Sequence, residues 1–345
     1  MMMVTIYDIA KKIGCASSTV SRALNGTRHV SPILKAEIEE TAKEMGYVAN
    51  VAARNLISNQ SWSIGVIYHE SLEIGLEHQY FGGILQAFKT YVEDEGYEIT
   101  FVSRRAGKQK LSYLEWCKSR RIIGVLIVTI DDKDSELVDL IESDIPVVSV
   151  NKVDLNCPTI VSDNEAGTVL AMEHFLNKNK KNIGHISLPE NSFSGKERRD
   201  TYKKFMREKN LEVDDNLLVI ASGYKCKDGY EAAVKMIEDS KVLPEAIYVG
   251  ADMLAIGAIR ALNDLGYHVP EDIEIIGFDD IELAKHITPT LTTIAQDKHR
   301  IGVEAGKLLI NYMGGDEEIH NNINMRIPVS LVERKSTNSS FVDKI

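Results

Sequence analysis

Short apolar runs alternate with longer segments of helical period from residue 63 to residue 278. The runs are too short for helices and are almost continuously apolar, which is typical of strands buried on both faces of a parallel sheet. The alternation predicts an α/β fold with helices on both sides of the sheet. The expected strands are 64–68, 98–102, 124–129 and 147–150 in a first series, and 183–188, 217–220, 246–250 and 273–278 in a second.

The first helix of the alternating region has a clear amphipathic pattern. Its apolar positions recur at helical spacing, and the pattern ends at Gly96, a residue type that often closes a helix. These positions are Phe81, Ile84, Leu85, Phe88 and Val92. The two series also open alike, with Ser-Ile-Gly-Val-Ile at 63–67 and Asn-Ile-Gly-His-Ile at 182–186. We therefore expect two doubly wound parallel-sheet lobes in tandem, with a cleft between them.

Residues 4–46 contain no strand-like run and predict short helices separated by turns. A helix, a tight turn and a second helix fit residues 4–25, where Gly14 can adopt the turn conformation and Ser17 can cap the second helix. Each helix has an apolar stripe, formed by Ile9, Ala10 and Ile13 in the first and by Val20, Ala23 and Leu24 in the second. The sequence predicts a small all-α helix-turn-helix head.

The outward positions of the second helix are small and polar, with one arginine among them. They are Ser17, Ser18, Thr19, Ser21 and Arg22. Such a surface suits a helix that enters a DNA major groove about 12 Å wide, because hydroxyl groups donate to phosphates and base edges without steric conflict. A merely solvated helix face would have the same composition, so that interpretation stays open.

The net charge of the chain, −11, is divided unequally between its two ends. Residues 1–60 hold seven Lys/Arg and five Asp/Glu, a net charge of +2, while the remainder holds 33 and 46, a net charge of −13. An acidic body with a mildly basic head indicates that only the head contacts a polyanion.

The sequence offers no catalytic or metal-binding pattern. The four cysteines, Cys15, Cys117, Cys157 and Cys226, lie far apart and predict free thiols. No GxGxxG follows a strand, and GxxxxGK[ST], GxSxG and HExxH are absent. No stretch has the roughly 18 apolar residues of a membrane span, and the first residues lack the apolar region of a signal peptide. We expect a cytoplasmic protein that is not an enzyme and has no cofactor, metal or membrane partner.

One family combines such a head with such a body. Residues 4–25, Val30-Ser31, Met45-Gly46-Tyr47 and residues 50–56 resemble the LacI/GalR family of bacterial repressors. The resemblance extends over the body, so the expected lobes are periplasmic-binding-protein-like. Two positions depart from the family pattern: Ala16 replaces a common Ser, and Ala49 replaces the usual Pro, which would have fixed φ before the hinge.

The resemblance implies how the head binds double-stranded operator DNA. The second helix would read the major groove, and residues 50–58 would form a hinge helix that Asn50 caps and in which the small Ala53 allows two copies to approach. Leu56 would wedge into the minor groove and bend the DNA, although an ordinary apolar contact at a domain junction would also explain it. The expected DNA-binding residues are Thr5, Tyr7, Ser17, Ser18, Thr19, Ser21, Arg22, Asn25, His29, Asn50, Ala53 and Leu56.

Ligands of open α/β sheets bind beyond the carboxyl ends of the strands. Aromatic and charged residues follow several expected strands, and this combination suits a sugar: aromatic faces stack on its C–H side, while Arg198 and Asp279 bind its hydroxyls. The resemblance implies the same role for Arg198, Tyr224 and Asp279, although Thr201 replaces the usual Gly near that arginine. The expected effector-binding residues are Tyr80, Phe81, Asp163, Ser194, Arg198, Tyr224 and Asp279.

Several of these positions have structural alternatives. Phe81 fits the helix core equally well, and Asp163 could cap a helix. Arg198 and Asp279 could form structural salt bridges. Asp252, in Gly-Ala-Asp at 250–252, fits a helix cap or hinge contact better than a ligand contact.

We expect five segments along the chain: a head at 1–48, a hinge helix and linker at 49–62, a first lobe at 63–161 plus about 292–323, a second lobe at 162–291 plus about 324–336, and a tail at 337–345. The predicted function is a sugar-controlled transcriptional repressor of carbohydrate metabolism genes that acts as a homodimer, because the tail has no leucine heptads. Two alternatives remain: a catabolite-control regulator with a phosphorylated carrier protein as corepressor, and a sugar-binding protein without a role on DNA.

Overall fold

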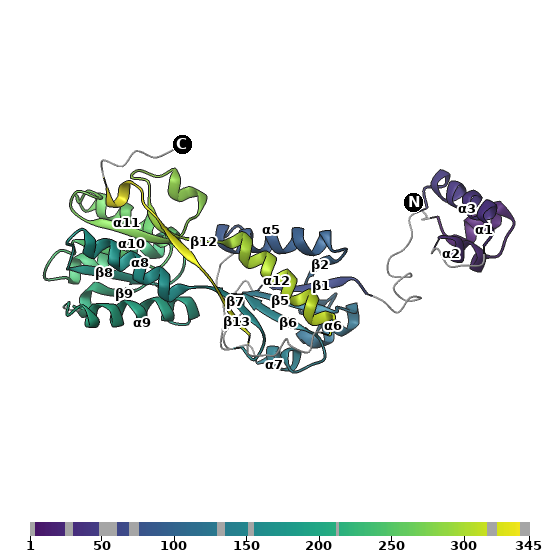
Figure 1. Cartoon of the computed structure of the whole chain (residues 1–345), viewed down its shortest axis with the longest axis horizontal. Coiled ribbons are helices and arrows are strands. Elements are labelled where there is room, and N and C mark those ends of the chain that lie inside the picture. The colour runs from purple at the N-terminus through teal and green to yellow at the C-terminus, as the bar shows by residue number, and fades with distance from the viewer. Residues whose placement is uncertain are drawn as a thin grey trace. The chain divides into compact units, whose positions relative to one another are not determined.

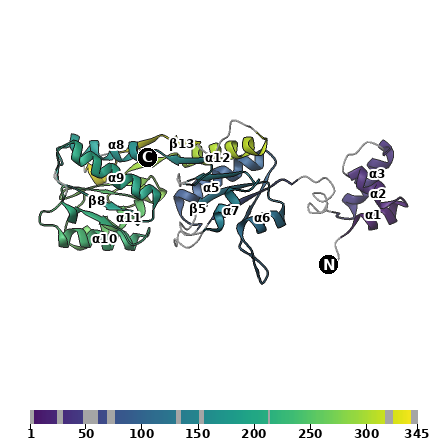
Figure 2. The ribbon, with the colours of Figure 1, turned by 90° about the horizontal axis from the view of Figure 1, so that it is seen from below.

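The structure, a computed structural model, describes residues 4–24, 30–47, 61–68, 76–129, 135–150, 155–211, 214–315 and 323–338. The chain divides into two compact units, Met1–Ser61 and Trp62–Ile345, which we call the head and the body (Figures 1 and 2). Five predicted DNA-binding residues lie outside the described residues: Asn25, His29, Asn50, Ala53 and Leu56.

Three helices form the head: α1 (Ile6–Ile13), α2 (Ser17–Leu24) and α3 (Pro32–Glu44). Gly14 ends α1 with φ +80°, a left-handed conformation that favours glycine, so the predicted tight turn is confirmed. The helices pack around a small core of Ile9, Ala10, Val20, Ala23, Ile38 and Ala42. The helix-turn-helix expected from the sequence is therefore present.

The first lobe of the body contains a six-stranded sheet in which every neighbouring pair is parallel. Its strands are β1 (Ser63–Tyr68), β2 (Glu98–Phe101), β5 (Gly124–Thr129), β6 (Val147–Val150), β7 (Thr159–Ser162) and β13 (Asn324–Ile327). Across the sheet their order is β2-β1-β5-β6-β7-β13.

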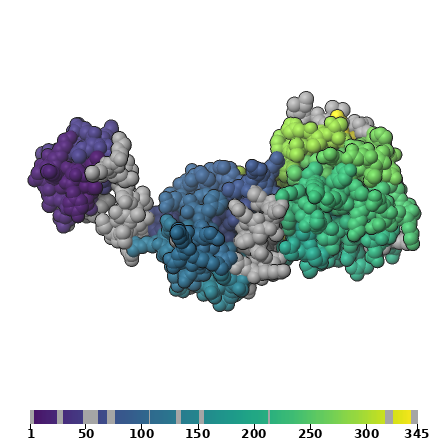
Figure 3. Space-filling model, turned by 180° about the vertical axis from the view of Figure 1, so that it is seen from behind, coloured from purple at the N-terminus to yellow at the C-terminus, as the bar shows by residue number. Residues whose placement is uncertain are grey.

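The second lobe repeats this arrangement with another six-stranded sheet. Its strands are β8 (Ile183–Ser187), β9 (Leu218–Ile220), β10 (Ala246–Val249), β11 (Glu274–Asp279), β12 (Thr292–Gln296) and β14 (Val329–Val332). Their order is β9-β8-β10-β11-β12-β14, and only the last pair is antiparallel. Five strands therefore follow the same order in both lobes, which confirms two similar doubly wound lobes. In the space-filling view the first lobe is mainly blue and the second mainly green (Figure 3).

Helices cover both faces of the first sheet. Along β5, Leu126 and Val128 face a core with α5 (Gln79–Asp94) and α12 (Lys298–Met313), while Val125 and Ile127 face a core with α6 (Tyr113–Arg120) and α7 (Glu136–Ile141). Successive side chains of a strand point to opposite faces, so a strand covered on both faces must be apolar throughout. The helix pattern that ends at Gly96 is confirmed as α5.

The second sheet is covered in the same way. Ile247 and Val249 of β10 face α10 (Cys226–Asp239) and α11 (Asp252–Asp264), while Ala246 and Tyr248 face α8 (Asn164–Asn177) and α9 (Phe193–Glu208). The helices α10 and α11 approach closely, because a Cβ atom added at Gly257 would lie 1.9 Å from the carbonyl oxygen of Cys226.

The chain crosses between the lobes three times: between β7 and α8, between β12 and α12, and between β13 and β14. The yellow C-terminal strands can be followed along both lobes in Figure 1. The expected boundaries near 292 and 324 were wrong by a few residues, because β12 pairs with β11 in the second sheet and β13 pairs with β7 in the first. Sheet membership depends on the pairing partner, which the local sequence does not encode.

The remaining described elements are small. A hairpin joins β3 (Arg105–Ala106) to β4 (Gln109–Lys110), and 3₁₀ helices cover η1 (Asp215–Leu217), η2 (Glu282–Lys285) and η3 (Lys335–Thr337). All four cysteines are free thiols. Within the described residues, no helix has the length and apolar character needed to cross a membrane.

Candidate DNA-binding head and effector cleft

Thr5 has a structural role at the start of α1. Its N–H group donates to the Asp8 carboxylate at 2.8 Å, and its hydroxyl accepts from the Asp8 N–H at 3.4 Å. These reciprocal bonds form a capping box, and hydrogen bonds from Thr5 hold the pKa of Asp8 below its usual value. The predicted contact between Thr5 and DNA stays a prediction.

The polar face of α2 lies opposite its buried residues, Val20 and Ala23. Ser18 and Arg22 are exposed, and the neighbouring Tyr7 of α1 is 70% exposed despite its aromatic ring. The other predicted DNA contacts on this helix are partly buried, namely Ser17, Thr19 and Ser21. A face of hydroxyls and one guanidinium can donate to phosphates and base edges.

The expectation that Ser17 caps α2 was wrong. Ser17 is already the first helical residue, and the carbonyl oxygen of Ala16 accepts hydrogen bonds from the N–H groups of Thr19 and Val20 at 2.9 and 3.2 Å. The capping position thus falls on Ala16, whose side chain has no acceptor.

Three predicted effector residues from different elements lie close to one another. They are Tyr80 in the first turn of α5, Arg198 in α9 and Asp279 at the end of β11, and all three are buried. Burial raises the pKa of the Tyr80 hydroxyl to about 12, and the charges of Asp279 and Arg198 both act on that hydroxyl. The boundary between the lobes therefore brings together an aromatic hydroxyl, a cation and a carboxyl group.

Arg198 is buried, with only 3% of its surface exposed, and three contacts hold its side chain in position. Its Nε donates to Asn164 Oδ1 at 3.0 Å, its Nη1 donates to the carbonyl oxygen of Gly250 at 2.5 Å, and its guanidinium lies 3.5 Å from the centre of the Phe278 ring. No carboxylate of a described residue pairs directly with it, and no described residue accepts from its Nη2. A buried cation that makes no direct ion pair favours a ligand that presents hydroxyl or carbonyl oxygens.

Asp279 combines burial with an unusual backbone. Burial raises its pKa to about 6, against the lowering effect of the charges of Arg198 and Lys298. Its Oδ1 accepts from Gln296 Nε2 at 2.6 Å, while Lys298 Nζ donates to its carbonyl oxygen at 3.3 Å. Its φ of +125° is rare for a residue other than glycine, and such strained positions often lie at ligand sites.

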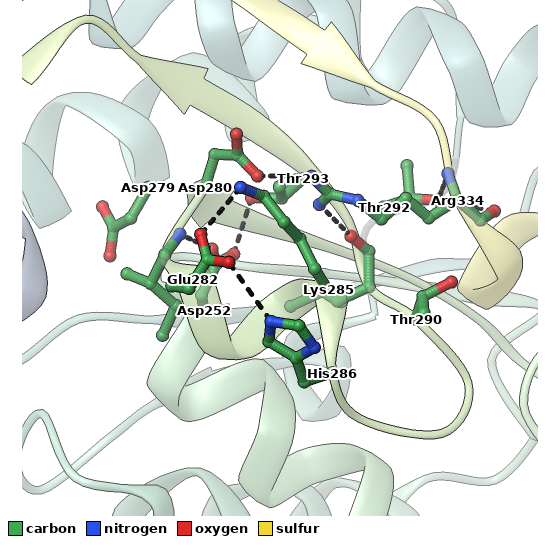
Figure 4. A network of polar contacts seen from close by, with 12 residues as sticks. Asp252, Asp279, Asp280, Glu282, Lys285, His286, Thr290, Thr292, Thr293 and Arg334 are labelled. Carbon is green, nitrogen blue, oxygen red and sulfur yellow. Dashed lines mark hydrogen bonds and ion pairs between the residues drawn. The ribbon is translucent and has the colours of Figure 1, made fainter. Parts of the chain in front are cut away.

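A polar network beside Asp279 holds the loop that follows β11 (Figure 4). Arg334 donates to the carboxylate of Asp280 at 2.6 Å. The buried carboxyl group of Asp252 accepts from the Ile281 N–H at 3.0 Å and from Thr293 Oγ1 at 2.6 Å. Burial raises the pKa of Asp252 well above its usual value. Asp252 makes the expected structural contact, but it does not cap α11 with its side chain.

The other predicted effector residues have packing or capping roles. Phe81 belongs to the core of the first lobe, and Asp163 caps α8 by accepting from the Ala166 N–H at 3.0 Å. Ser194 is buried in the first turn of α9, with its hydroxyl 3.2 Å from that of Ser192. Tyr224 packs against the cores of both lobes, so it lies at the boundary between them.

Among the described residues with buried, unsatisfied polar atoms, sequence reasoning missed two that bear on the ligand site. Gln296 Oε1 and Ser149 Oγ have no hydrogen-bond partner among the described residues. Both lie at or near the carboxyl ends of strands, β12 and β6, where ligands of such sheets bind. A buried acceptor without a partner favours a ligand donor at that place. If β12 had been predicted from the sequence, Gln296 would have been identified as a candidate, because it lies at the carboxyl end of that strand, as Asp279 does on β11.

Known proteins share this architecture. Residues 5–50 match the family "Bacterial regulatory proteins, lacI family", and residues 172–337 match "Periplasmic binding protein-like domain". The chain is similar in structure to the Lac repressor dimer bound to operator and the anti-inducer ONPF, with a TM-score of 0.82 at 27% identity over 97% of this chain and 99% of that one.

Two curated relatives span nearly the whole chain. The HTH-type transcriptional repressor PurR of Mannheimia succiniciproducens is 32% identical over 97% of this chain and 98% of its own length. Catabolite control protein A of Priestia megaterium is 29% identical over 97% of this chain and 100% of its own length. These relatives are regulators and not enzymes. The chain belongs to the lacI family of bacterial regulatory proteins and is a DNA-binding transcriptional repressor.

Proposed function

We propose that this repressor is controlled by a small hydroxyl-rich effector, a sugar or sugar derivative, that binds between Arg198 and Asp279. The observation that carries the proposal is this pair of buried groups of opposite charge beside Tyr80. The guanidinium donates to ligand oxygens, and the Asp279 carboxylate and Gln296 Oε1 accept from ligand hydroxyls. A sugar offers both functions on adjacent carbons, and Tyr224 offers an aromatic face.

One relative supports control by a small molecule. The similar Lac repressor structure holds operator DNA and an anti-inducer at once. A ligand that binds one lobe arrangement more tightly than another shifts the balance between them, and operator affinity follows by linkage. We propose the same coupling here, in a homodimer that places two heads on the half-sites of a pseudo-palindromic operator.

A thermal-shift screen of the full chain tests the effector class. Monosaccharides, disaccharides and nucleobases are compared at equal concentrations, with Arg198→Ala as the site variant. A ligand present at 100 times its Kd stabilises the folded protein by about 2.7 kcal/mol, which is several degrees for a protein of this size. Stabilisation by sugars in the wild type alone supports the proposal. Stabilisation of the wild type by nucleobases but not by sugars would contradict the sugar class of the effector, while the assignment of Arg198 to the effector site would still stand.

A substitution at Leu56 separately tests the predicted binding and bending of operator DNA. Leu56→Ala removes the apolar wedge, so operator affinity should fall about 10-fold or more and the DNA should bend less, because unstacking a base step costs a few kcal/mol that only the inserted side chain offsets. Phased gel-shift assays on DNA selected from a random library measure both. Unchanged bending by a folded dimer would contradict the wedge role.

A second candidate is favoured by the similarity to Catabolite control protein A over nearly the whole chain. In this case the corepressor would be a phosphorylated carrier protein that binds outside the cleft. Gel shifts with the carrier, phosphorylated and not, distinguish the two, because Arg198→Ala should abolish a response to sugar and leave a response to the carrier unchanged.

A further inference from the structure

A second polar cluster lies where the chain crosses between the lobes. β7 of the first sheet ends at Ser162, and α8 of the second lobe begins at Asn164. β13 of the first sheet ends at Ile327, and a single residue separates it from β14 of the second, which begins at Val329. These two crossings lie side by side, because Ser162 pairs with Ile327. Together with the crossing between β12 and α12, they must absorb any change in the angle between the lobes.

An ion pair joins the lobes beside these crossings. Arg326 belongs to β13 of the first sheet, and Glu197 belongs to α9 of the second lobe. Arg326 Nη2 donates to Glu197 Oε1 at 2.5 Å, and Arg326 Nη1 lies 3.4 Å from Glu197 Oε2. The hydrogen bond with Glu197 raises the pKa of Arg326. The guanidinium thus meets both carboxylate oxygens, a geometry that fixes the direction as well as the distance.

The ion pair continues to the effector arginine through one amide. Glu197 Oε2 accepts from Asn164 Nδ2 at 2.8 Å, and Asn164 Oδ1 accepts from Arg198 Nε at 3.0 Å. Asn164 is almost fully buried. Its amide has only one favourable orientation, because the NH₂ group must face the carboxylate and the oxygen must face the guanidinium. Arg326, Glu197, Asn164 and Arg198 therefore form one continuous chain of contacts.

We propose that the Glu197–Arg326 ion pair is an interlobe clasp that couples the position of Arg198 to the angle between the lobes. This proposal rests on the effector role of Arg198 given above, and it makes Glu197 and Arg326 positioning residues that touch no ligand. A change in lobe angle displaces Arg326 relative to Glu197, and Asn164 passes the displacement to Arg198. A ligand that holds Arg198 favours the lobe angle at which this chain of contacts is intact.

The clasp differs from the other ion pairs of α9. The side chains of Glu197 and Arg326 are 14% and 32% exposed, while those of Lys204 and Glu208, 4.0 Å apart on one face of α9, are 61% exposed or more. An exposed pair within one helix contributes little and joins no lobes. Glu208 therefore provides a matched control on the same helix.

The test uses the full chain with Glu197→Gln, Arg326→Gln, the double variant, the conservative Arg326→Lys and the control Glu208→Gln. Pulsed electron resonance measures the distance between spin labels at Thr90→Cys in α5 and Lys235→Cys in α10, two exposed positions, with Cys15 and Cys226 replaced by Ser. The Nε–H NMR signal of Arg198, assigned by its loss in Arg198→Lys, reports on the bond to Asn164. Neither measurement needs a ligand.

Glu197→Gln and Arg326→Gln should each shift or broaden the interlobe distance by about 2 Å or more and move the Arg198 signal, and the double variant should add nothing further. Arg326→Lys should keep the interlobe distance and the Arg198 signal close to those of the wild type. Glu208→Gln should leave both unchanged from the wild type. Unchanged distances in both single variants, additive shifts, or an unmoved Arg198 signal would overturn the clasp. A failed effector screen would leave these results intact, so failure of the effector assignment can be distinguished from failure of the clasp.

Discussion

The two lobes share one strand order but supply different chemistry to the boundary between them. The second lobe provides the charged groups, Arg198 and Asp279, together with the buried Asp252 beneath them. The first lobe provides mainly aromatic side chains from the start of α5, where Tyr80 and Phe81 belong to its core. The first lobe also contributes polar groups, Ser149 of β6 and Lys298 of α12, but neither is a carboxyl or guanidinium group.

This difference indicates how a ligand would be bound. Placing charged groups in a buried site is costly unless other polar groups hold them, and the second lobe holds its charged groups with hydrogen bonds. The first lobe would mainly cover the ligand with aromatic side chains and exclude water. Substitutions in the second lobe should therefore reduce ligand affinity more than substitutions in the first.

Arg198→Ala should give the largest effect, a loss of ligand affinity of about 100-fold or more, because it removes a buried charged donor. Isothermal calorimetry with the best ligand of the thermal-shift screen measures it. The control is Arg260→Ala in α11, since Arg260 also lies over an aromatic ring, 5.8 Å from the centre of Tyr230, but on an exposed face. Equal losses in both variants would contradict the anchoring role.

The two lobes can also be compared without a ligand, through the close packing of α10 against α11 in the second lobe and of α5 against α12 in the first. A Cβ atom at Gly257 would lie 1.9 Å from a backbone oxygen in the second lobe, and one at Gly302 would lie 2.4 Å from the Ile84 oxygen in the first. Alanine should therefore lower the free energy of unfolding by about 3 kcal/mol at Gly257 and about 2 kcal/mol at Gly302. Denaturant titration measures both changes.

Gly82→Ala is the control for these two variants, because its Cβ atom would meet nothing closer than 3.4 Å. It should be neutral or stabilise α5 by up to about 1 kcal/mol. A loss at Gly82 as large as at Gly257 would show that close helix contact is not the cause.

Asp279→Asn should change how stability depends on pH. Burial raises the pKa of Asp279 to about 6, above its ordinary value of 3.8, so the folded state holds this proton more tightly than the unfolded state. That stabilisation is complete below pH 3.8 and is lost as the pH rises through 6. Relative to the variant, the wild type should lose up to about 3 kcal/mol of unfolding free energy between pH 4 and pH 7.

Denaturant titrations of both proteins at several pH values measure this difference. Asp272→Asn is the control of opposite sign, because hydrogen bonds from His268 hold the pKa of Asp272 below its usual value. A constant difference between wild type and Asp279→Asn across this range would contradict the raised pKa.

Tyr80→Phe should give the smallest effect, a two- to tenfold loss of ligand affinity, because it removes one neutral hydroxyl and keeps the ring. The same calorimetric titration measures it. A loss as large as that of Arg198→Ala would contradict the division of roles between the lobes.

The sequence predicts most accurately those strands that are buried along their whole length. The bounds of β5 and β6 are as expected, because both are continuous buried runs in the middle of the sheet. β7 and β12 were missed, since each contains threonine with only a short apolar stretch, and their burial depends on distant partners. The same dependence explains the misplaced lobe boundaries.

The residues of the candidate effector site also divide into those that the local sequence predicted and those that only the tertiary contacts identify. Arg198 and Asp279 were predicted because each follows a strand that the sequence shows plainly. Asn164 and Glu197 were missed, because their importance depends on contacts between α8, α9 and β13 that only the fold creates. Local sequence indicates which groups can bind a ligand, and tertiary packing decides which of them are held in position.

The most direct test compares operator affinity with and without ligand in the wild type and in Arg198→Ala. Fluorescence anisotropy would use DNA selected by the full chain and the best ligand of the screen. The account predicts a 5- to 150-fold change in the wild type, and in Arg198→Ala an unchanged affinity without ligand and no response to it. A full ligand response in Arg198→Ala, or none in a wild type that binds the ligand, would contradict it.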